Sequence, residues 1–262
     1  METTETKDLL VSIQDGLMEL TLNRPQSLNA FSPEMIIGLK THLQLASDDD
    51  EVKVVVIKGA GRSFSAGGDV KTMGDASPVE VFDHIGQLNG LIEQMRQLEK
   101  PIIAAVHGFA AGAGFNLALA CDLIVAAEGT SFILSFAQVG LVSDGGGHFF
   151  IPRALTPYQA KEILFKAEPL DAKQAQQWGL VNHVYPLAEM EEKTREFALS
   201  FTKQPVKAIG LMKKLTNLAD TASLQEILEA ERITQSMMVT TNDHHEGVSA
   251  FKEKRKPNFK GN

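Results

Sequence analysis

Cysteine is almost missing from this sequence, which has a single one, Cys121, among 262 residues. Without a second cysteine, no disulfide can form within the chain. Cys121 lies in an apolar stretch, residues 117–121, and no basic side chain stands nearby to activate its thiol. We therefore interpret it as a small buried core residue and expect no thiol chemistry.

Long hydrophobic runs and an excess of basic residues are missing as well. No uninterrupted apolar run approaches the roughly 18 residues of a membrane-spanning helix, so we expect no membrane partner. Residues 1–8 are polar and acidic, unlike a secretion signal, and predict a cytoplasmic protein. The net charge of −8, from 25 Lys and Arg against 33 Asp and Glu, disfavours nucleic acid as a partner.

The common metal and nucleotide motifs are also absent. The pair His244-His245 lacks the further ligands that a metal site needs, and a solvated helix face explains it better. Gly112 and Gly114 imitate the start of a dinucleotide-binding loop, but Leu117 stands where its third glycine belongs. We therefore expect no metal and no dinucleotide.

What the sequence does contain is an alternation of strand and helix, which indicates an α/β architecture. Asp15-Gly16 separates two β-rich runs and predicts a hairpin. Continuous apolar runs further along suit strands that are covered on both faces. The predicted strands are residues 9–13, 17–22, 53–58 and 102–106.

Helix starts are marked by serine followed by proline. Ser32-Pro33 and Ser77-Pro78 each supply a capping hydroxyl and a proline at the first helical position. The second of these helices is predicted to run to about Glu99. Further helices are predicted to begin at Pro205 and Ser223.

We divide the chain into a core, residues 1–195, and a helical C-terminal region, residues 196–262. Apolar residues of that region recur at spacings of three and four, including Leu224, Ile227 and Leu228. The resulting face could pack within the chain or against a partner subunit. The end of the region is basic and could be a solvated tail or an anion contact. Its basic residues are Lys252, Lys254, Arg255, Lys256 and Lys260.

The most informative residues lie in three glycine-rich loops, residues 63–69, 108–116 and 140–147. Small residues let a chain turn tightly or approach a ligand closely. The second loop leads into a helix, whose free N–H groups favour negative charge. Two N–H groups from separate loops could hold an oxyanion that exists only in a transition state, but spacing alone does not show that they converge.

A set of short segments in fixed order carries a resemblance: residues 22–30, 64–69, 105–114, 120–122, 140–141 and 178–181. Through them the chain resembles the enoyl-CoA hydratase/isomerase, or crotonase, family over nearly its whole length. The resemblance implies a spiral of ββα turns followed by a C-terminal helical region. It also implies acyl-CoA thioester substrates, no cofactor besides the CoA of the substrate, and a homo-oligomer, either a trimer or a dimer of trimers.

The resemblance further implies which residues form the site. Two backbone N–H groups of that family stabilise a thioester enolate, and by position these belong to Gly68 and Ala113. Main-chain atoms near Ala66 correspond to an adenine contact and Arg24 to a phosphate contact. The tail corresponds to a segment that reaches the CoA of a neighbouring subunit. The implied substrate-binding residues are Arg24, Ala66, Gly67, Asp69, Gly112, Asn116, Phe136, Phe251 and Lys254.

The reaction depends on carboxylates, and here the chain departs from the hydratase pattern. Hydratases of the family use two glutamates, at positions where this chain has Asn116 and Phe136. Asp144, four residues after Gly140, matches the single catalytic carboxylate of several isomerases of the family. The resemblance therefore favours an enoyl-CoA isomerase with Asp144 as its base. A hydratase with another proton relay and a non-catalytic binding scaffold remain as alternatives.

Considered alone, several of these polar residues have plainer interpretations. Asp144 follows Ser143 at a predicted helix start and could be an N-cap. His148, one helical turn later, could instead tune the carboxylate of Asp144. We interpret His107 and Asp122 as structural residues.

Overall fold

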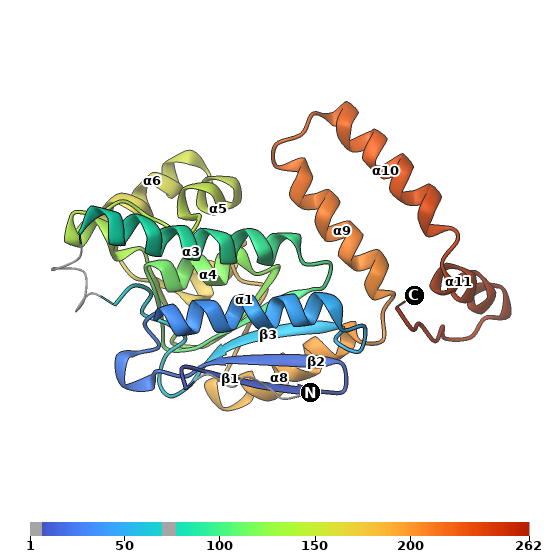
Figure 1. The fold of residues 1–262 in the computed structure, drawn as a ribbon, viewed down its shortest axis with the longest axis horizontal. Helices are drawn as coiled ribbons and strands as arrows, with labels where there is room; N and C mark the ends of the chain where they lie inside the picture. Colours follow the sequence, from blue (N-terminus) through green and yellow to red (C-terminus); the bar gives the residue numbers. More distant parts are fainter. Residues whose placement is uncertain (1–6, 70–76, 262) are drawn as a thin grey trace.

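The structure, a computed structural model, describes residues 7–69 and 77–261, and a largely parallel sheet forms its centre (Figure 1). Its six strands lie in the order β1-β2-β3-β4-β6-β9, and every pair after the β1–β2 hairpin is parallel. The predicted hairpin is confirmed, with φ of 56° at Asp15 and 80° at Gly16 in its turn. The strands are β1 (Leu9–Gln14), β2 (Leu17–Leu22), β3 (Val54–Gly59), β4 (Ile102–Val106), β6 (Leu123–Ala127) and β9 (His183–Tyr185).

A smaller sheet has three strands in the order β5-β7-β8. After β4 the chain enters β5, passes through α4 and returns to the large sheet as β6. It repeats this path through β7, β8 and α7 before it reaches β9. The expected spiral of ββα turns is therefore present. Its elements are β5 (Phe109–Ala111), α4 (Ala113–Ala120), β7 (Ser131–Ile133), β8 (Leu170–Asp171) and α7 (Ala172–Gln177).

Helices cover both faces of the large sheet, and each face has its own hydrophobic core. In Figure 1, α1, α3 and α4 lie on one side of the sheet and α8 lies on the other. Successive residues of β3 point to opposite faces, so Val55 and Ile57 join the first core while Val54 and Val56 join the second. The helices not yet bounded are α1 (Pro33–Asp48), α3 (Pro78–Gln97) and α8 (Leu187–Phe201).

Serine caps begin the two long helices, as the sequence predicts. The Ser32 hydroxyl accepts a hydrogen bond from a backbone N–H in the first turn of α1, at 3.1 Å. Ser77 and Glu80 form a reciprocal capping box at the start of α3. The buried side chains of α3, Leu88 among them, follow from helical spacing and face the core.

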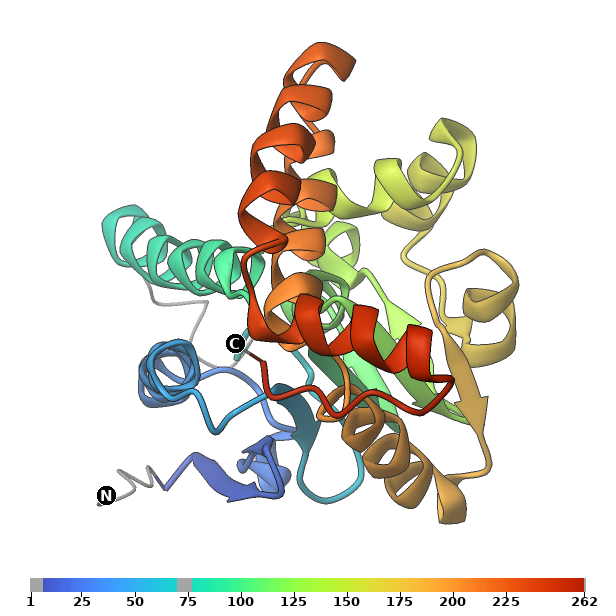
Figure 2. The same cartoon turned by 90° about the vertical axis from the view of Figure 1, so that its right-hand side faces the viewer.

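The C-terminal helices extend away from the core. α9 and α10 form an antiparallel pair that projects from the body, and α11 crosses near the base of that pair (Figures 1 and 2). Lys213 attaches α9 to the body, because its ammonium nitrogen lies 2.8 Å from the Asp122 carboxylate. Asp122 is thus structural, as predicted. These helices are α9 (Val206–Ala219), α10 (Leu224–Met238) and α11 (Asn242–Glu253).

Two predictions from the composition concern the whole chain. Cys121 is buried and burial raises the pKa of its thiol, which agrees with an inert core residue. Among the helices of the described residues, none combines the length and the apolar character needed to cross a bilayer. The cytoplasmic location stays a prediction.

The remaining elements are η1 (Pro25–Ser27), η2 (Ser135–Val139), α5 (Gly147–Ala154) and α6 (Pro157–Lys166).

Candidate active site

The first two glycine-rich loops converge. Gly67, in the loop that follows β3, has φ of +81°, and a Cβ atom built on it would lie 2.5 Å from the Ala111 oxygen and 2.7 Å from the Ala113 nitrogen. Ser65 fixes this approach, since its carbonyl accepts a hydrogen bond from the Ala111 N–H at 2.9 Å. Only glycine permits the two backbones to lie so close at position 67.

The N–H groups of Gly68 and Ala113 lie on these two loops. Ala113 is the first residue of α4, so its N–H has no acceptor within the helix. Within the described parts of the chain, neither this N–H nor that of Gly68 donates a hydrogen bond. Two uncommitted donors on adjoining loops can share one oxygen of a ligand.

Phe136 lies beside the same corner. Gly112, the residue before α4, has φ of +51°, and a Cβ atom there would lie 3.6 Å from the ring of Phe136. Phe136 is partly buried and packs on the main core. An aromatic ring thus flanks the second loop at the position where a hydratase of the family has a glutamate.

Asn116 joins α4 to the loop that carries Asp144. Its side chain is fully buried, and its Nδ2 donates to the Ser143 hydroxyl at 2.9 Å and to the Asp144 carbonyl oxygen at 2.7 Å. Because Asn116 lies one helical turn after Ala113, these bonds place Asp144 next to the two donor loops. Asn116 therefore acts as a structural link in the site.

The carboxyl group of Asp144 is unusually placed. Its Oδ1 is buried and contacts no hydrogen-bond partner among the described residues. Burial raises the pKa of Asp144 above its usual value, and a positive charge at His84 together with a hydrogen bond from the backbone N–H of Asp144 partly offsets this rise. The N-cap of α5 is Gly146 and no side chain caps that helix, so the capping interpretation of Asp144 is wrong. A free carboxyl oxygen with a raised pKa suits general acid–base chemistry.

His84 is a site residue that the sequence analysis missed. It lies on α3 and is half-buried, and a positive charge on it would lower the pKa of Asp144, whereas His148 is exposed. The signal was present in the sequence, since His84 stands four residues before Leu88 and extends the buried stripe of α3 by one turn. Helical periodicity could have placed it on the core-facing side.

Arg24 is held by neighbours within the chain. Its guanidinium group lies 3.3 Å from Asp69 and 3.6 Å from Asp8, and it donates to the Ala30 carbonyl oxygen at 2.8 Å. The Ala66 N–H donates to the Leu28 carbonyl oxygen at 2.8 Å. The segment after β2 and the first glycine-rich loop therefore form one unit, which contains four of the predicted substrate-binding residues: Arg24, Ala66, Gly67 and Asp69.

The predicted tail residues lie elsewhere. Phe251 is 86% exposed on α11, and Lys254 follows that helix. In Figure 1, α11 lies at the right, while α5, which begins soon after Asp144, lies on the other side of α9 and α10. Within one chain, the structure does not bring Phe251 and Lys254 to Asp144.

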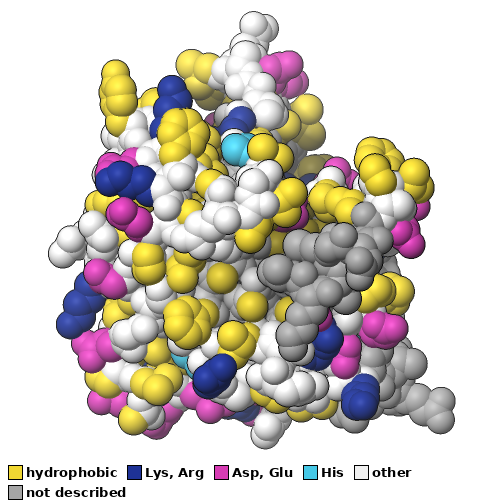
Figure 3. Space-filling model, turned by 90° about the vertical axis from the view of Figure 1, so that its left-hand side faces the viewer, with side chains coloured by type: hydrophobic (Ala, Val, Ile, Leu, Met, Phe, Trp, Pro, Cys, Tyr) yellow, Lys and Arg dark blue, Asp and Glu magenta, His cyan; other side chains and the backbone are white. Residues whose placement is uncertain are grey.

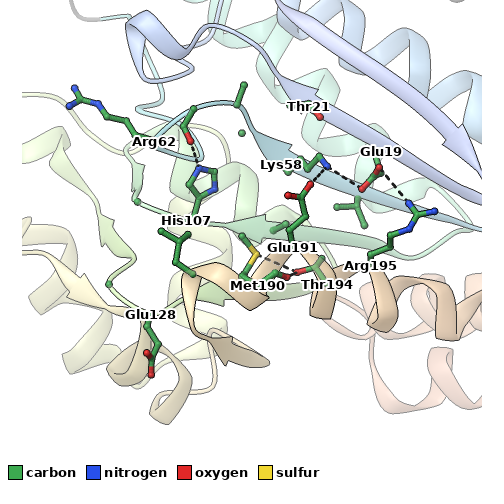
Figure 4. A pocket seen from close by; sticks show the side chains of 18 residues that line it. Glu19, Thr21, Lys58, Arg62, His107, Glu128, Met190, Glu191, Thr194 and Arg195 are labelled. Carbon is green, nitrogen blue, oxygen red and sulfur yellow. Dashed lines mark hydrogen bonds and ion pairs between the residues drawn. The ribbon is translucent and has the colours of Figure 1, made fainter.

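A separate cavity of about 550 Å³ lies between the sheet and α8 (Figure 4). Several of its charges pair within it: Lys58 lies 3.2 Å from Glu19 and 2.8 Å from Glu191. His107 Nε2 contacts the Gly61 carbonyl oxygen at 2.9 Å, which supports its structural interpretation. None of the predicted site residues lines this cavity. Among the described residues, no cluster of three or more His, Cys, Asp or Glu could hold a metal.

Comparisons with known proteins agree with this geometry. The family model described as enoyl-CoA hydratase/isomerase matches residues 12–262. The 1,2-epoxyphenylacetyl-CoA isomerase of Escherichia coli K12 is 35% identical over 97% of this chain and 98% of its own length. The 2,3-dehydroadipyl-CoA hydratase of the same organism is also 35% identical, over 97% of this chain and 99% of its own length.

The fold agrees as well. The crystal structure of an enoyl-CoA hydratase from Polaromonas sp. JS666 superimposes with a TM-score of 0.93 at 33% identity, covering 96% of this chain and 99% of the other. An isomerase and a hydratase are equally similar in sequence, so similarity does not select the reaction. Family model, relatives and fold together show that this chain belongs to the enoyl-CoA hydratase/isomerase, or crotonase, family.

Proposed function

We propose that the chain is a cofactor-free isomerase that shifts the double bond of an unsaturated acyl-CoA. The observation that carries this proposal is the Asp144 carboxyl group, with a buried, unpartnered oxygen and a raised pKa, held next to the two donor loops by Asn116. Asp144 is the acid–base group. The N–H groups of Gly68 and Ala113 stabilise the enolate.

The mechanism needs one proton carrier. The Asp144 carboxylate removes a proton from the carbon next to the thioester of a 3-enoyl-CoA, and the electron pair delocalises onto the thioester oxygen. The N–H groups of Gly68 and Ala113 hold that negative charge. The carboxylic acid then returns the proton two carbons away, which gives the 2-enoyl product and the original carboxylate.

A hydratase makes a further demand, because water must be positioned and deprotonated. The amide of Asn116 does not exchange a proton at neutral pH, and its Nδ2 is already committed to Ser143 and Asp144. Phe136 offers no polar atom. These two residues favour the isomerase over the hydratase.

The acyl group is proposed to be apolar. Figure 3 shows hydrophobic side chains on the face where α3 begins. Val79 and Phe82 of α3 are 68% and 78% exposed, and Leu141 and Val142 of the Asp144 loop are 50% and 78% exposed. Exposed apolar side chains on two segments that flank the site suit an apolar ligand.

We also infer an assembly with threefold symmetry, in which α11 of one subunit brings Phe251 and Lys254 to the CoA of its neighbour. α10 buries none of its side chains within the chain. An apolar cavity of about 830 Å³ lies among α9, α10 and α11, which suits a covering partner. The exposed apolar residues of α10 are Leu224, Leu228, Ile233 and Met237.

The proposal is tested with a panel of 2-enoyl- and 3-enoyl-CoA thioesters, with products identified by mass spectrometry and NMR. We expect the double bond to move without a gain of water. Rapid hydration of crotonyl-CoA without any isomerisation would support the hydratase instead. CoA binding without turnover of any thioester would support the non-catalytic scaffold.

A further inference from the structure

We propose that His84 is a positioning residue of the acid–base site, whose cation holds the carboxyl group of Asp144 in its proton-accepting form. The inference rests on the proposed role of Asp144 and adds α3 to the catalytic apparatus. Its basis is the place where α3, α4 and the Asp144 loop meet.

That meeting point is Gly145, the residue after Asp144. A Cβ atom built on Gly145 would lie 3.3 Å from Leu88 Cδ2 of α3 and 3.5 Å from Asn116 Cβ of α4. Gly145 is buried and has φ of +55°, a conformation that suits glycine. The loop therefore turns directly against α3 at the catalytic carboxylate.

The helical repeat then places His84. Residues four apart lie on one face of a helix, about 6 Å apart along its axis, so His84 stands one turn before Leu88 on the side that meets the loop. His84 is half-buried, whereas Leu88 is 2% exposed. One further turn back, the carboxylate of Glu80 is committed to the Ser77 N–H at 2.8 Å in the capping box.

The other described ionisable side chains of α3, α4 and α5 near Gly145 are exposed or committed to other partners. α4 carries no ionisable side chain. On α5, His148 is exposed, and the guanidinium group of Arg153 stacks on the Phe149 ring at 3.6 Å. Asp83 of α3 is exposed. Of the described residues, the half-buried His84 is the one whose positive charge would lower the pKa of Asp144.

Burial and a cation at His84 act on the pKa of Asp144 with opposite signs, and a hydrogen bond from its own backbone N–H acts in the same direction as the cation. Burial disfavours the carboxylate and raises the pKa of Asp144, while a cation at His84 favours the carboxylate and lowers that pKa. The readiness of Asp144 to take a proton therefore depends on the state of His84, and loss of the imidazole should raise the pKa of Asp144.

The experiment compares His84→Gln with His148→Gln, which removes an exposed histidine of the neighbouring helix. The protonation midpoint of Asp144 is followed by infrared spectroscopy, with its carboxyl band identified by its loss in Asp144→Asn. We expect the midpoint to move to higher pH in His84→Gln and to stay in place in His148→Gln. His84→Lys, which keeps a cation, should restore a low midpoint.

An unchanged midpoint in well-folded His84→Gln would overturn the proposal, and so would equal shifts in both glutamine variants. The acidic limb of the pH profile of kcat/KM should move in parallel with the midpoint. Because the infrared titration needs no turnover, it tests His84 even if Asp144 proves not to be the base. Failure of the isomerase proposal would appear instead as full activity in Asp144→Asn.

Discussion

At the scale of single residues, Asp144 separates the possible reactions. Asp144→Asn keeps the size of the side chain but removes the proton carrier, so isomerisation should fall by roughly 10²- to 10⁴-fold. CoA affinity should stay near that of the unchanged protein. The measurement is the turnover of a 3-enoyl-CoA, together with CoA titration calorimetry.

Asp144→Asn should also change the pH dependence of stability. The folded-state pKa of Asp144 is raised by burial, so the folded protein binds this proton more tightly than the unfolded chain does. The resulting stabilisation is complete at low pH and is lost as the pH rises through the folded pKa. Asp144→Asn removes this loss, so its Tm at pH 7 should equal or exceed that of the unchanged protein. A clear drop in Tm would show that the carboxylate is mainly structural.

Ala113 tests the oxyanion site. Proline is well tolerated at the first position of a helix, so Ala113→Pro should preserve α4 while it removes the N–H. Loss of one such donor typically costs about 10²- to 10³-fold in rate. Ala113→Ser keeps the N–H and serves as the control. Normal kcat in a folded Ala113→Pro protein would exclude this group from the mechanism, and Gly68→Pro extends the test to the other loop.

At the scale of elements, a buried cation helps to attach α9 to the body. Lys213 is 7% exposed, pairs with Asp122 at 2.8 Å and donates to the Met95 carbonyl oxygen at 2.7 Å. Lys213→Met should lower the free energy of unfolding by about 3 to 5 kcal/mol, since it leaves Asp122 without its partner. Lys214→Met breaks an exposed pair with Glu99 and should cost at most about 1 kcal/mol. Denaturant unfolding compares the two, and equal losses would contradict this view.

Helices and strands could be predicted from the sequence where neighbouring residues determine how they begin or turn. Asp15-Gly16 marks the hairpin, and Ser32 and Ser77 mark helix starts, because turns and caps depend on neighbouring residues. The small sheet was not predicted, since strands as short as Phe109–Ala111 carry too few residues for a pattern. Its strands form because the spiral brings distant segments side by side.

The candidate site was predictable only in part. The resemblance supplied Gly68, Ala113 and Asp144, and the structure brings their loops together. The link through Asn116 and the approach of His84 were not predictable, because both depend on how α3 and α4 pack. A helical repeat gives the face of a residue but not the loop that this face meets.

At the scale of the whole molecule, the C-terminal tail connects binding with assembly. Removal of the residues after Thr240 deletes α11 and should weaken both CoA affinity and self-association. Phe251→Ser and Lys254→Ala in the full chain should weaken CoA affinity alone. Calorimetry and analytical ultracentrifugation measure the two effects. A truncated protein that binds CoA as tightly as the full chain would remove the tail from the ligand site.

Assembly itself is checked by sedimentation of the full chain. The exposed apolar residues of α10 predict self-association at micromolar concentration, and the proposed assembly has threefold symmetry. Leu228→Glu and Met237→Glu place charges on that face and should dissociate it, whereas Glu229→Gln, on the same helix, should not. A stable monomer of the unchanged protein would contradict the proposal.

The hydrogen bonds that hold Asp144 to Asn116 also have a stereochemical consequence. The loop of Asp144 is held by the hydrogen bond from Asn116 Nδ2 to the Asp144 carbonyl oxygen, at 2.7 Å. The single carboxyl group on this loop therefore reaches a planar dienolate from one side. The proton that leaves the carbon next to the thioester and the proton that arrives two carbons away must therefore use the same face of the substrate. A 3-enoyl-CoA with deuterium in one of its two prochiral positions at that carbon should lose either the deuterium or the hydrogen selectively.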